Sequence, residues 1–134
     1  MAAPWIRDGY RSLNPYIVVD RVEPLLAFLV EVFGGEERGE RELRGDGTIG
    51  HAEFAFGDSV LMLSEASENP ARPSVVYAYV EDVDAVFRRA ADAGATHLRE
   101  PADWPWGDRV AGFHDPFDNR WWAATCLGAA TSDR

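Results

Sequence analysis

Apolar and polar positions along the chain follow two kinds of spacing, which succeed each other in the same order twice. Residues 13–19 and 74–80 are short, largely apolar runs of the kind that predicts strands. A stripe at helical spacing follows each run: Leu25, Leu26, Leu29, Val32 and Phe33 after the first, and Val83, Val86, Phe87 and Ala90 after the second. The pattern therefore predicts a strand–helix unit that recurs after about sixty residues.

Residues with known capping preferences mark the ends of both helices. Asp20 and Glu23 form the two halves of a capping box before the first helix, and Gly34 ends that helix. Asp82 caps the second helix, and Gly94 ends it. We therefore expect each helix to begin at an acidic side chain and to end at a glycine.

Three further strands are predicted after each helix. Their ranges are 36–44, 49–56 and 59–64 after the first helix, and 96–99, 109–114 and 120–126 after the second. A polar, proline-containing linker at residues 66–73 separates a βαβββ unit of residues 12–65 from one of residues 74–126. We predict an α+β fold in one domain of residues 1–134, in which the two units form a curved mixed sheet with helices on the convex face and an open concave groove.

Composition narrows the class of protein. A chain of 134 residues, 46% of them hydrophobic, is long enough to bury a core. The net charge of −10 disfavours nucleic acid and an anionic membrane surface as partners. It would either attract a cationic molecule or simply aid solubility, and charge alone does not separate these two interpretations. The lone Cys126 fits a reducing compartment, and no apolar run is long enough to span a membrane. We therefore expect a cytoplasmic protein that binds neither nucleic acid nor membrane.

Alternation along the predicted strands separates side chains that face the groove from those that form the core. The groove-facing set is Asn14, Tyr16, Val18, His51, Glu53, Ala55, Val60, Met62, Ser64, Val75, Tyr77, Tyr79, Trp122 and Ala124. The opposite phase supplies the core: Ile17, Val19, Phe54, Leu61, Leu63, Val76, Val80 and Trp121. The groove is therefore expected to be rich in aromatic rings.

Four of the five tryptophans lie within residues 103–122. Trp104 and Trp106 occupy a loop punctuated by proline and glycine, where a large apolar ring gains little stability by facing water. Alternation in the last strand turns Trp121 to the core and Trp122 to the groove. Trp104, Trp106 and Trp122 are therefore predicted to line a ligand pocket; the alternative is that Trp122 belongs to the core and the two loop indoles cap it.

Several short motifs occur at a characteristic spacing in the two units. They are Pro15-Tyr16-Ile17-Val18-Val19, residues 28–35, His51-Ala52-Glu53-Phe54, Gly57-Asp58-Ser59-Val60-Leu61-Met62-Leu63, Val80-Glu81-Asp82-Val83-Asp84, Trp106-Gly107-Asp108-Arg109, and Asp115-Pro116-Phe117-Asp118-Asn119. Their order resembles that of the vicinal oxygen chelate superfamily, which includes glyoxalase I, extradiol dioxygenases and the bleomycin-resistance proteins. Asp118 stands where the turn of the family usually has glycine, so the turn is expected to be shifted.

The resemblance also indicates where a metal would be held. Metal-dependent members carry a His, Gln or Glu ligand on the first and last strand of each unit, and the corresponding positions here are Asn14, Met62, Val75 and Trp122. A catalytic divalent cation needs about three ligands from His or carboxylate. We therefore expect no metal and no other cofactor.

Without a metal, the groove becomes a surface for binding a ligand. The residues predicted to bind it are Tyr16, His51, Glu53, Met62, Tyr77, Tyr79, Trp104, Trp106 and Trp122. Such a face suits a large, partly planar molecule, and Glu53 would either pair with a cation on it or remain an exposed strand carboxylate. His51 has no second acid or nucleophile beside it, so no catalytic residue is predicted.

In character, the chain resembles most the metal-free bleomycin-resistance proteins, which are acidic homodimers that hold a drug against a tryptophan. The resemblance implies a homodimeric binding protein that sequesters a toxic aromatic or cationic natural product and so gives antibiotic resistance. The alternative is a lyase, isomerase or dioxygenase of the same superfamily that acts on a small organic substrate. A ligand sensor is a third, weaker alternative. We expect a binding protein rather than an enzyme.

Overall fold

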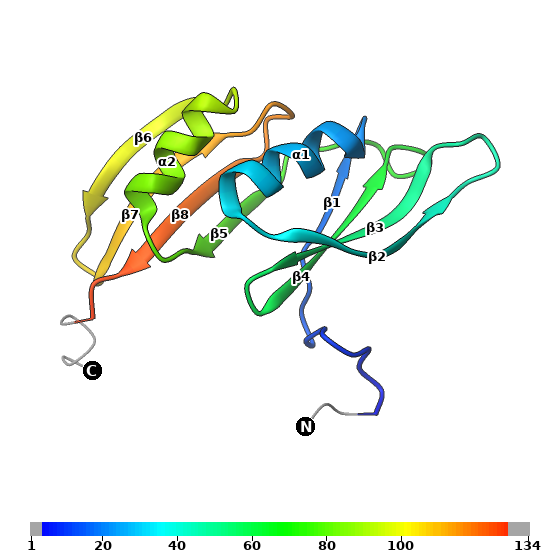
Figure 1. Cartoon of the computed structure of the whole chain (residues 1–134), viewed down its shortest axis with the longest axis horizontal. Helices are drawn as coiled ribbons and strands as arrows, with labels where there is room; N and C mark the ends of the chain where they lie inside the picture. The colour runs from blue at the N-terminus through cyan, green and yellow to red at the C-terminus, as the bar shows by residue number, and fades with distance from the viewer. Residues whose placement is uncertain (1–3, 129–134) are drawn as a thin grey trace. The chain divides into compact units, whose positions relative to one another are not determined.

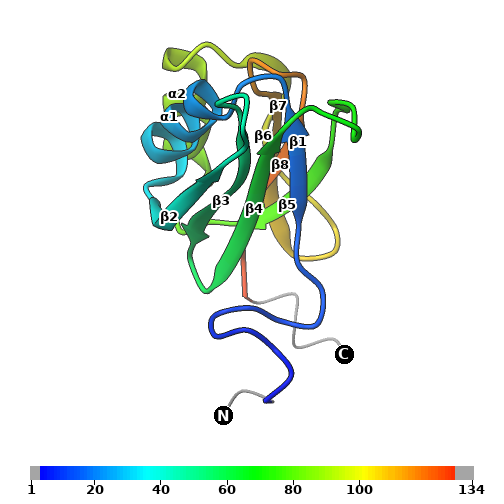
Figure 2. The same cartoon turned by 90° about the vertical axis from the view of Figure 1, so that its right-hand side faces the viewer.

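The computed structural model describes residues 4–128, which divide into two compact units. Unit 1 consists of residues 4–30 and 34–72, and unit 2 consists of residues 31–33 and 73–128. Each unit contains one four-stranded sheet (Figures 1 and 2). The single domain of residues 1–134 stays a prediction, and its residues 1–3 and 129–134 lie outside the described residues.

The first repeat has a β-strand, a helix and three further strands. They are β1 (Tyr16–Val19), α1 (Val22–Phe33), β2 (Glu36–Leu43), β3 (Ile49–Phe56) and β4 (Ser59–Glu65). The strands are ordered β1-β4-β3-β2 in the sheet. The β1–β4 pair is parallel, whereas the other two pairs are antiparallel, so the sheet is mixed.

The second repeat has the same order of elements. They are β5 (Val75–Tyr79), α2 (Val83–Asp92), β6 (Thr96–Asp103), β7 (Asp108–His114) and β8 (Arg120–Cys126). The sheet order is β5-β8-β7-β6, again with one parallel pair, and α2 packs against β6, β7 and β8. The prediction of an α+β fold with two βαβββ units is confirmed, with the strands divided between two mixed four-stranded sheets.

The pairing of the strands gives each sheet a row of neighbouring residues that corresponds to a row in the other sheet. In unit 1, one row of paired residues crosses β1, β4, β3 and β2 through Tyr16, Met62, Glu53 and Arg38. In unit 2, the corresponding row crosses β5, β8, β7 and β6 through Tyr77, Trp122, Gly112 and Arg99. We call these two sets the matched rows. Both rows begin with tyrosine and end with arginine, and they differ at the two central strands.

The predicted phase of the strands agrees with the burial of their side chains. The buried members of the predicted core are Ile17, Val19, Phe54, Leu61, Leu63 and Trp121. Val76 and Val80 are only half-buried. On the other face, Tyr16, Tyr77 and Tyr79 are exposed, as alternation requires.

The two helices begin differently. Asp82 caps α2 as predicted, because its carboxylate accepts a hydrogen bond from the Ala85 N–H at 3.2 Å. The capping box predicted before α1 is wrong: Arg21 occupies the N-cap position, and the Val22 N–H donates to Glu65 Oε2 at 2.9 Å. A carboxylate from the end of β4 thus does the work expected of Asp20, which no local sequence pattern reveals.

The strand before the tryptophan loop is longer than predicted. The expected strand of residues 96–99 extends to Asp103 as β6, although Pro101 lies within it. A proline is tolerated there because β6 is an edge strand, where the missing N–H breaks no ladder on the free side. The remaining loop is a tight turn, in which the Trp104 N–H donates to the Asp108 carbonyl and the Gly107 N–H to the Trp104 carbonyl.

The turn between β7 and β8 keeps its place despite the departure at Asp118. Asp118 adopts the left-handed conformation, with φ 68°, so the predicted shift of this turn is wrong. The buried Asp115 carboxylate accepts hydrogen bonds from the backbone N–H groups of Phe117 and Asn119, the Asn119 amide and the Trp121 indole. These bonds outweigh the cost of a left-handed aspartate, which is about 1 kcal/mol. Within residues 4–128, neither helix has the length and apolar character that crossing a membrane requires.

Candidate functional site

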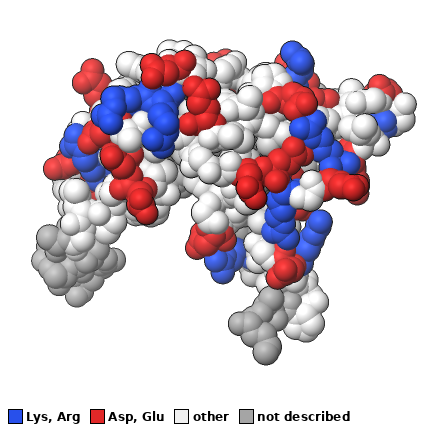
Figure 3. Space-filling model, viewed as in Figure 1, with Lys and Arg blue, Asp and Glu red and all other residues white. Residues whose placement is uncertain are grey.

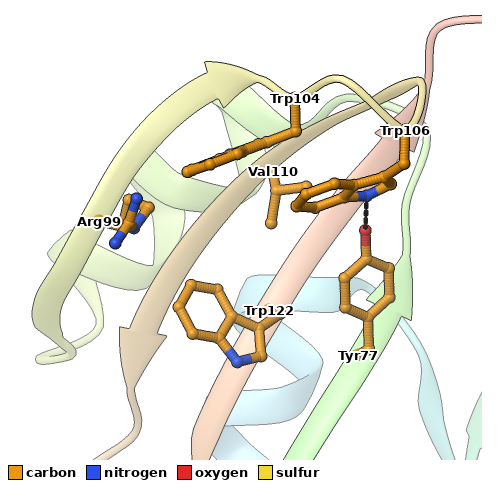
Figure 4. Close-up of a pocket in the computed structure, with 6 residues that line it drawn as sticks. All are labelled: Tyr77, Arg99, Trp104, Trp106, Val110 and Trp122. Carbon is orange, nitrogen blue, oxygen red and sulfur yellow. Dashed lines mark hydrogen bonds between the residues drawn. The ribbon is translucent and has the colours of Figure 1, made fainter.

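A pocket of about 250 Å³ lies within unit 2, over the face of the sheet that α2 leaves open (Figure 4). Its walls come from every strand of the sheet and from the β6–β7 turn. The lining residues are Tyr77, Arg99, Trp104, Trp106, Val110 and Trp122. Four of the six carry aromatic rings, so the pocket is chiefly an assembly of flat apolar surfaces.

The β6–β7 turn places two indoles side by side. The rings of Trp104 and Trp106 stack with centroids 5.3 Å apart and an interplanar angle of 19°. The Trp106 indole N–H donates to the Tyr77 hydroxyl at 3.4 Å, which ties the turn to β5 (Figure 4). Trp106 nevertheless remains 60% exposed, so part of a large apolar face stays uncovered beside the pocket.

The third indole depends on a glycine in the neighbouring strand. A Cβ atom at Gly112 would lie 2.5 Å from Cζ3 and 2.8 Å from Cε3 of Trp122, closer than any real Cβ contact. Only glycine therefore lets the Trp122 ring lie against the backbone of β7. The isolated glycine inside an apolar strand was the sequence signal for this close approach.

A buried carboxylate fixes the tyrosines of β5. Asp108, which is 4% exposed, accepts hydrogen bonds from the hydroxyls of Tyr77 at 2.6 Å and Tyr79 at 2.8 Å. The bond to Asp108 raises the pKa of Tyr79 to about 12. Burial, followed by the same carboxylate, raises the pKa of Tyr77 above its ordinary value. Both phenols therefore stay protonated at neutral pH and act as structural donors instead of bases.

The one charged side chain among the six lining residues is a cation, Arg99. The guanidinium of Arg99 lies 5.0 Å from the ring centroid of Trp104. Among residues 4–128, no acidic side chain forms an ion pair with it. Arg99, Val110 and Asp108 were not predicted as site residues, because no local pattern shows which side chains the pairing of β6 with β7 brings together.

Glu53 has the opposite environment in unit 1. Its carboxylate is 5% exposed and meets Arg7 at 3.2 Å, Arg38 at 3.5 Å and His51 at 3.2 Å. The Tyr10 hydroxyl also donates to it. Burial acts to raise the pKa of Glu53, but the hydrogen bonds from Tyr10 and His51 and the charges of both arginines outweigh it and hold the pKa below its ordinary value.

These contacts attach the N-terminal segment to unit 1. Tyr10 and Arg7 both reach Glu53, and the Asp8 carbonyl accepts a hydrogen bond from Arg38 at 2.6 Å. Burial, followed by the bond to Glu53, raises the pKa of Tyr10 to about 12, so its hydroxyl remains a donor. Glu53 is therefore already neutralised by groups of its own chain.

The structure brings only part of the predicted binding set together. The pocket collects Tyr77, Trp104, Trp106 and Trp122, and Tyr79 joins Tyr77 at Asp108. Tyr16, His51, Glu53 and Met62 belong to unit 1, where the Tyr16 hydroxyl lies 2.8 Å from Ser64 Oγ. That these nine residues bind a ligand stays a prediction.

The four positions that correspond to superfamily metal ligands do not fit a metal. The Asn14 side-chain amide is already hydrogen-bonded to the Arg11 backbone: it accepts from the Arg11 N–H at 2.9 Å and donates to the Arg11 carbonyl at 2.7 Å. Val75 has no donor atom, and Trp122 presents a ring. Among residues 4–128, no three His, Cys, Asp or Glu side chains gather as metal ligands would.

Fold and motif order together define the class of protein. Residues 12–123 match the model of the Glyoxalase/Bleomycin resistance protein/Dioxygenase superfamily, and the chain belongs to this superfamily. It is similar to the uncharacterized protein Mb0911c of Mycobacterium bovis, with 34% identity over 122 residues that cover 82% of this chain and 80% of the relative. The uncharacterized protein Rv0887c of Mycobacterium tuberculosis is also 34% identical over 122 residues, which cover 82% of this chain and 71% of that protein.

Solved structures show the same fold. TioX from Micromonospora sp. ML1 aligns with a TM-score of 0.68 and 25% identity over 87% of this chain and all of that one. A glyoxalase/bleomycin resistance protein/dioxygenase family enzyme from Burkholderia phytofirmans PsJN aligns with a TM-score of 0.66 and 19% identity, covering 84% of this chain and 95% of that chain. The second likeness supports the fold alone.

Proposed function

We propose that this protein is a metal-free, small-molecule-binding protein of the bleomycin-resistance type that sequesters a toxic natural product bearing a flat aromatic group. The observation that carries the proposal is the pocket of unit 2, in which Trp104, Trp106, Trp122 and Tyr77 surround one cavity. Rings of this kind recognise other rings by stacking, at about 0.5–1.5 kcal/mol for each contact beyond the burial of area. Sequestration needs affinity and no chemistry, which agrees with a lining that holds no nucleophile or base.

The chemistry of the available donors favours binding over metal-dependent catalysis. Asn14, Met62, Val75 and Trp122 offer no set of His or carboxylate ligands at the positions where the superfamily places them. The phenols of Tyr77 and Tyr79 hold their protons because Asp108 accepts from both. A glyoxalase- or dioxygenase-type enzyme would therefore need ligands from elsewhere, and elemental analysis of the purified protein tests this alternative.

Titration with bleomycin, mitomycin and a quinoxaline-type peptide antibiotic, followed by intrinsic fluorescence and thermal shift, tests the proposal. At least one of them is expected to bind and to raise the melting temperature by mass action. Trp106→Ala and Trp122→Ala should each weaken binding about tenfold, whereas Trp5→Ala serves as the control, because Trp5 is 77% exposed and belongs to unit 1. Equal affinities for all four proteins would overturn the proposed pocket.

A homodimer is part of the same proposal. The edge strand β5 exposes Val75 by 67% and Tyr79 by 62%, and an apolar edge strand of this kind is a surface that a second copy can cover. Light scattering should give twice the chain mass of 14.9 kDa, and Val75→Glu should halve it. A wild-type mass of one chain at micromolar concentration would remove the dimer from the proposal.

A further inference from the structure

We infer that the pocket of unit 2 takes a planar aromatic anion, with the acidic group of the ligand placed on Arg99 and its ring held against Trp104, Trp106 and Trp122. This inference rests on the proposed function and specifies the chemistry of its ligand. It departs from the cationic ligand that the net charge of −10 favours, because the local lining decides what a pocket holds.

The matched rows differ in what lies opposite their arginine. In unit 1, Arg38 on β2 lies opposite Glu53 on β3, and the two form an ion pair at 3.5 Å. In unit 2, Arg99 on β6 lies opposite Gly112 on β7, so this strand position carries no carboxylate, and the apolar ring of Trp122 covers it instead. Arg99 thus has the strand position of Arg38 without the acid that neutralises Arg38. A carboxylate on a ligand would supply the missing acid.

The side chains that line the pocket are chiefly hydrogen-bond donors. The guanidinium of Arg99 and the indoles of Trp104, Trp106 and Trp122 can donate but cannot accept. Tyr77 is the one lining side chain with an acceptor oxygen; its proton goes to Asp108, and its oxygen already accepts from Trp106. A ligand must therefore offer acceptors to satisfy this lining, and an anion offers the strongest ones.

The size and shape of the pocket limit the ligand to a small, flat molecule. The volume of about 250 Å³ lies just below the range of about 300–1,000 Å³ that is usual for ligand pockets, so it holds one fused ring system and not an entire glycopeptide. In Figure 4, the paired rings of Trp104 and Trp106 lie on one side of the space and the ring of Trp122 lies across from them, with Arg99 at one end. A flat bicycle with its acid at the Arg99 end matches this arrangement.

Three naphthalene probes of one shape and different charge test the inference. They are 2-naphthoate, 2-naphthamide and 2-naphthylmethylammonium, each titrated against the full chain by calorimetry. We expect 2-naphthoate to bind about fivefold more tightly than the amide, since Arg99 is exposed and its ion pair is partly screened by water. Added salt should reduce this advantage without weakening the amide.

Arg99→Gln should remove the advantage of 2-naphthoate over 2-naphthamide, because the charge that distinguishes the two probes is gone. Arg88→Gln is the matched control, because it removes the same charge from an exposed position on α2 and should change neither affinity. Equal loss in both variants would show a general charge effect and overturn the inference.

Other outcomes separate this inference from the function on which it rests. Tightest binding of 2-naphthylmethylammonium, or equal binding of the amide and the acid, would overturn the anion while leaving the pocket in place. Binding of an antibiotic but of no naphthalene probe would do the same. If neither the probes nor the antibiotics bind, the proposed function fails together with the inference.

Discussion

The two βαβββ units share one plan but treat their open faces in opposite ways. In unit 1, the matched row holds a glutamate, and Arg38, Arg7 and Tyr10 close over it. In unit 2, a glycine replaces that glutamate, so the Trp122 ring lies on β7, and Arg99 has no acidic partner within residues 4–128. The two central positions of a repeated row thus decide whether the open face carries an ion pair of its own chain or aromatic rings beside a lone arginine.

The turns that follow the third strand of each unit differ as well. Gly57 and Asp58 alone join β3 to β4, and the Asp58 side chain is 85% exposed. The longer turn between β7 and β8 is built around the carboxylate of Asp115, which is 2% exposed. Unit 2 therefore depends on a buried polar network where unit 1 needs only a tight glycine turn.

The largest expected effect tests this difference between the turns. Asp115→Ala removes an acceptor used by four donors, including the Trp121 indole at 2.9 Å. It should lower the free energy of unfolding by about 2–4 kcal/mol, because the donors are left buried without partners. The matched change Asp58→Ala should cost less than about 0.5 kcal/mol. Urea denaturation measures the free energy of unfolding of both variants. Equal losses would show that the two turns do not differ in their dependence on a buried carboxylate.

The second prediction concerns the glycine that distinguishes the matched rows. Gly112→Ala places a Cβ 2.5 Å from the Trp122 ring, so the ring must move away from β7. We expect a loss of about 1–3 kcal/mol in stability from overpacking, together with weaker binding of any pocket ligand. Gly45→Ala is the control, because a Cβ there meets no atom within 4 Å. Unchanged tryptophan fluorescence and an unchanged free energy of unfolding in Gly112→Ala would refute the role assigned to this glycine.

The third prediction tests whether unit 1 is closed by its own chain. Glu53→Gln removes the charge that Arg7 and Arg38 share, and it should cost about 1–2 kcal/mol and speed hydrogen exchange at Tyr10. Because the pKa of Glu53 lies below its ordinary value, its contribution is present above the unfolded pKa of about 4.3 and is lost as the pH falls through the folded pKa. The variant should therefore lose less stability on acidification than the wild type. A parallel loss in both proteins would mean that Glu53 holds nothing in place.

The smallest expected effect concerns the phenols of β5. Asp108→Asn removes the acceptor charge that raises the pKa of Tyr79 to about 12, so this pKa should fall toward the ordinary value of about 10. Since the folded pKa is raised, the wild-type contribution is complete below about 10 and is lost as the pH rises through about 12. Ultraviolet absorbance of tyrosinate follows the titration. The same titration curve in both proteins would show that Asp108 does not set the ionisation of Tyr79.

Local signals predicted most of the fold and some of the site. The helical stripes, the glycine stops and the strand alternation depend on residues close in sequence, so Gly34, Asp82 and the burial of Trp121 followed from the pattern. The cap that Glu65 gives to α1 could not be predicted, since Glu65 lies far along the chain from Val22. The same holds for the role of Arg99, because its place opposite Gly112 follows from the pairing of β6 with β7 and not from its neighbours in sequence.

The sequence by itself determined that the chain folds as two βαβββ units and that unit 2 carries clustered indoles, because periodicity and residue type are local properties. Only the tertiary structure decided that Glu53 is already paired, that Gly112 lies beneath Trp122, and that Arg99 lies opposite a glycine instead of an acid. The physical reason is register: hydrogen bonds between strands choose which side chains become neighbours, and the charge balance of a site follows from that choice.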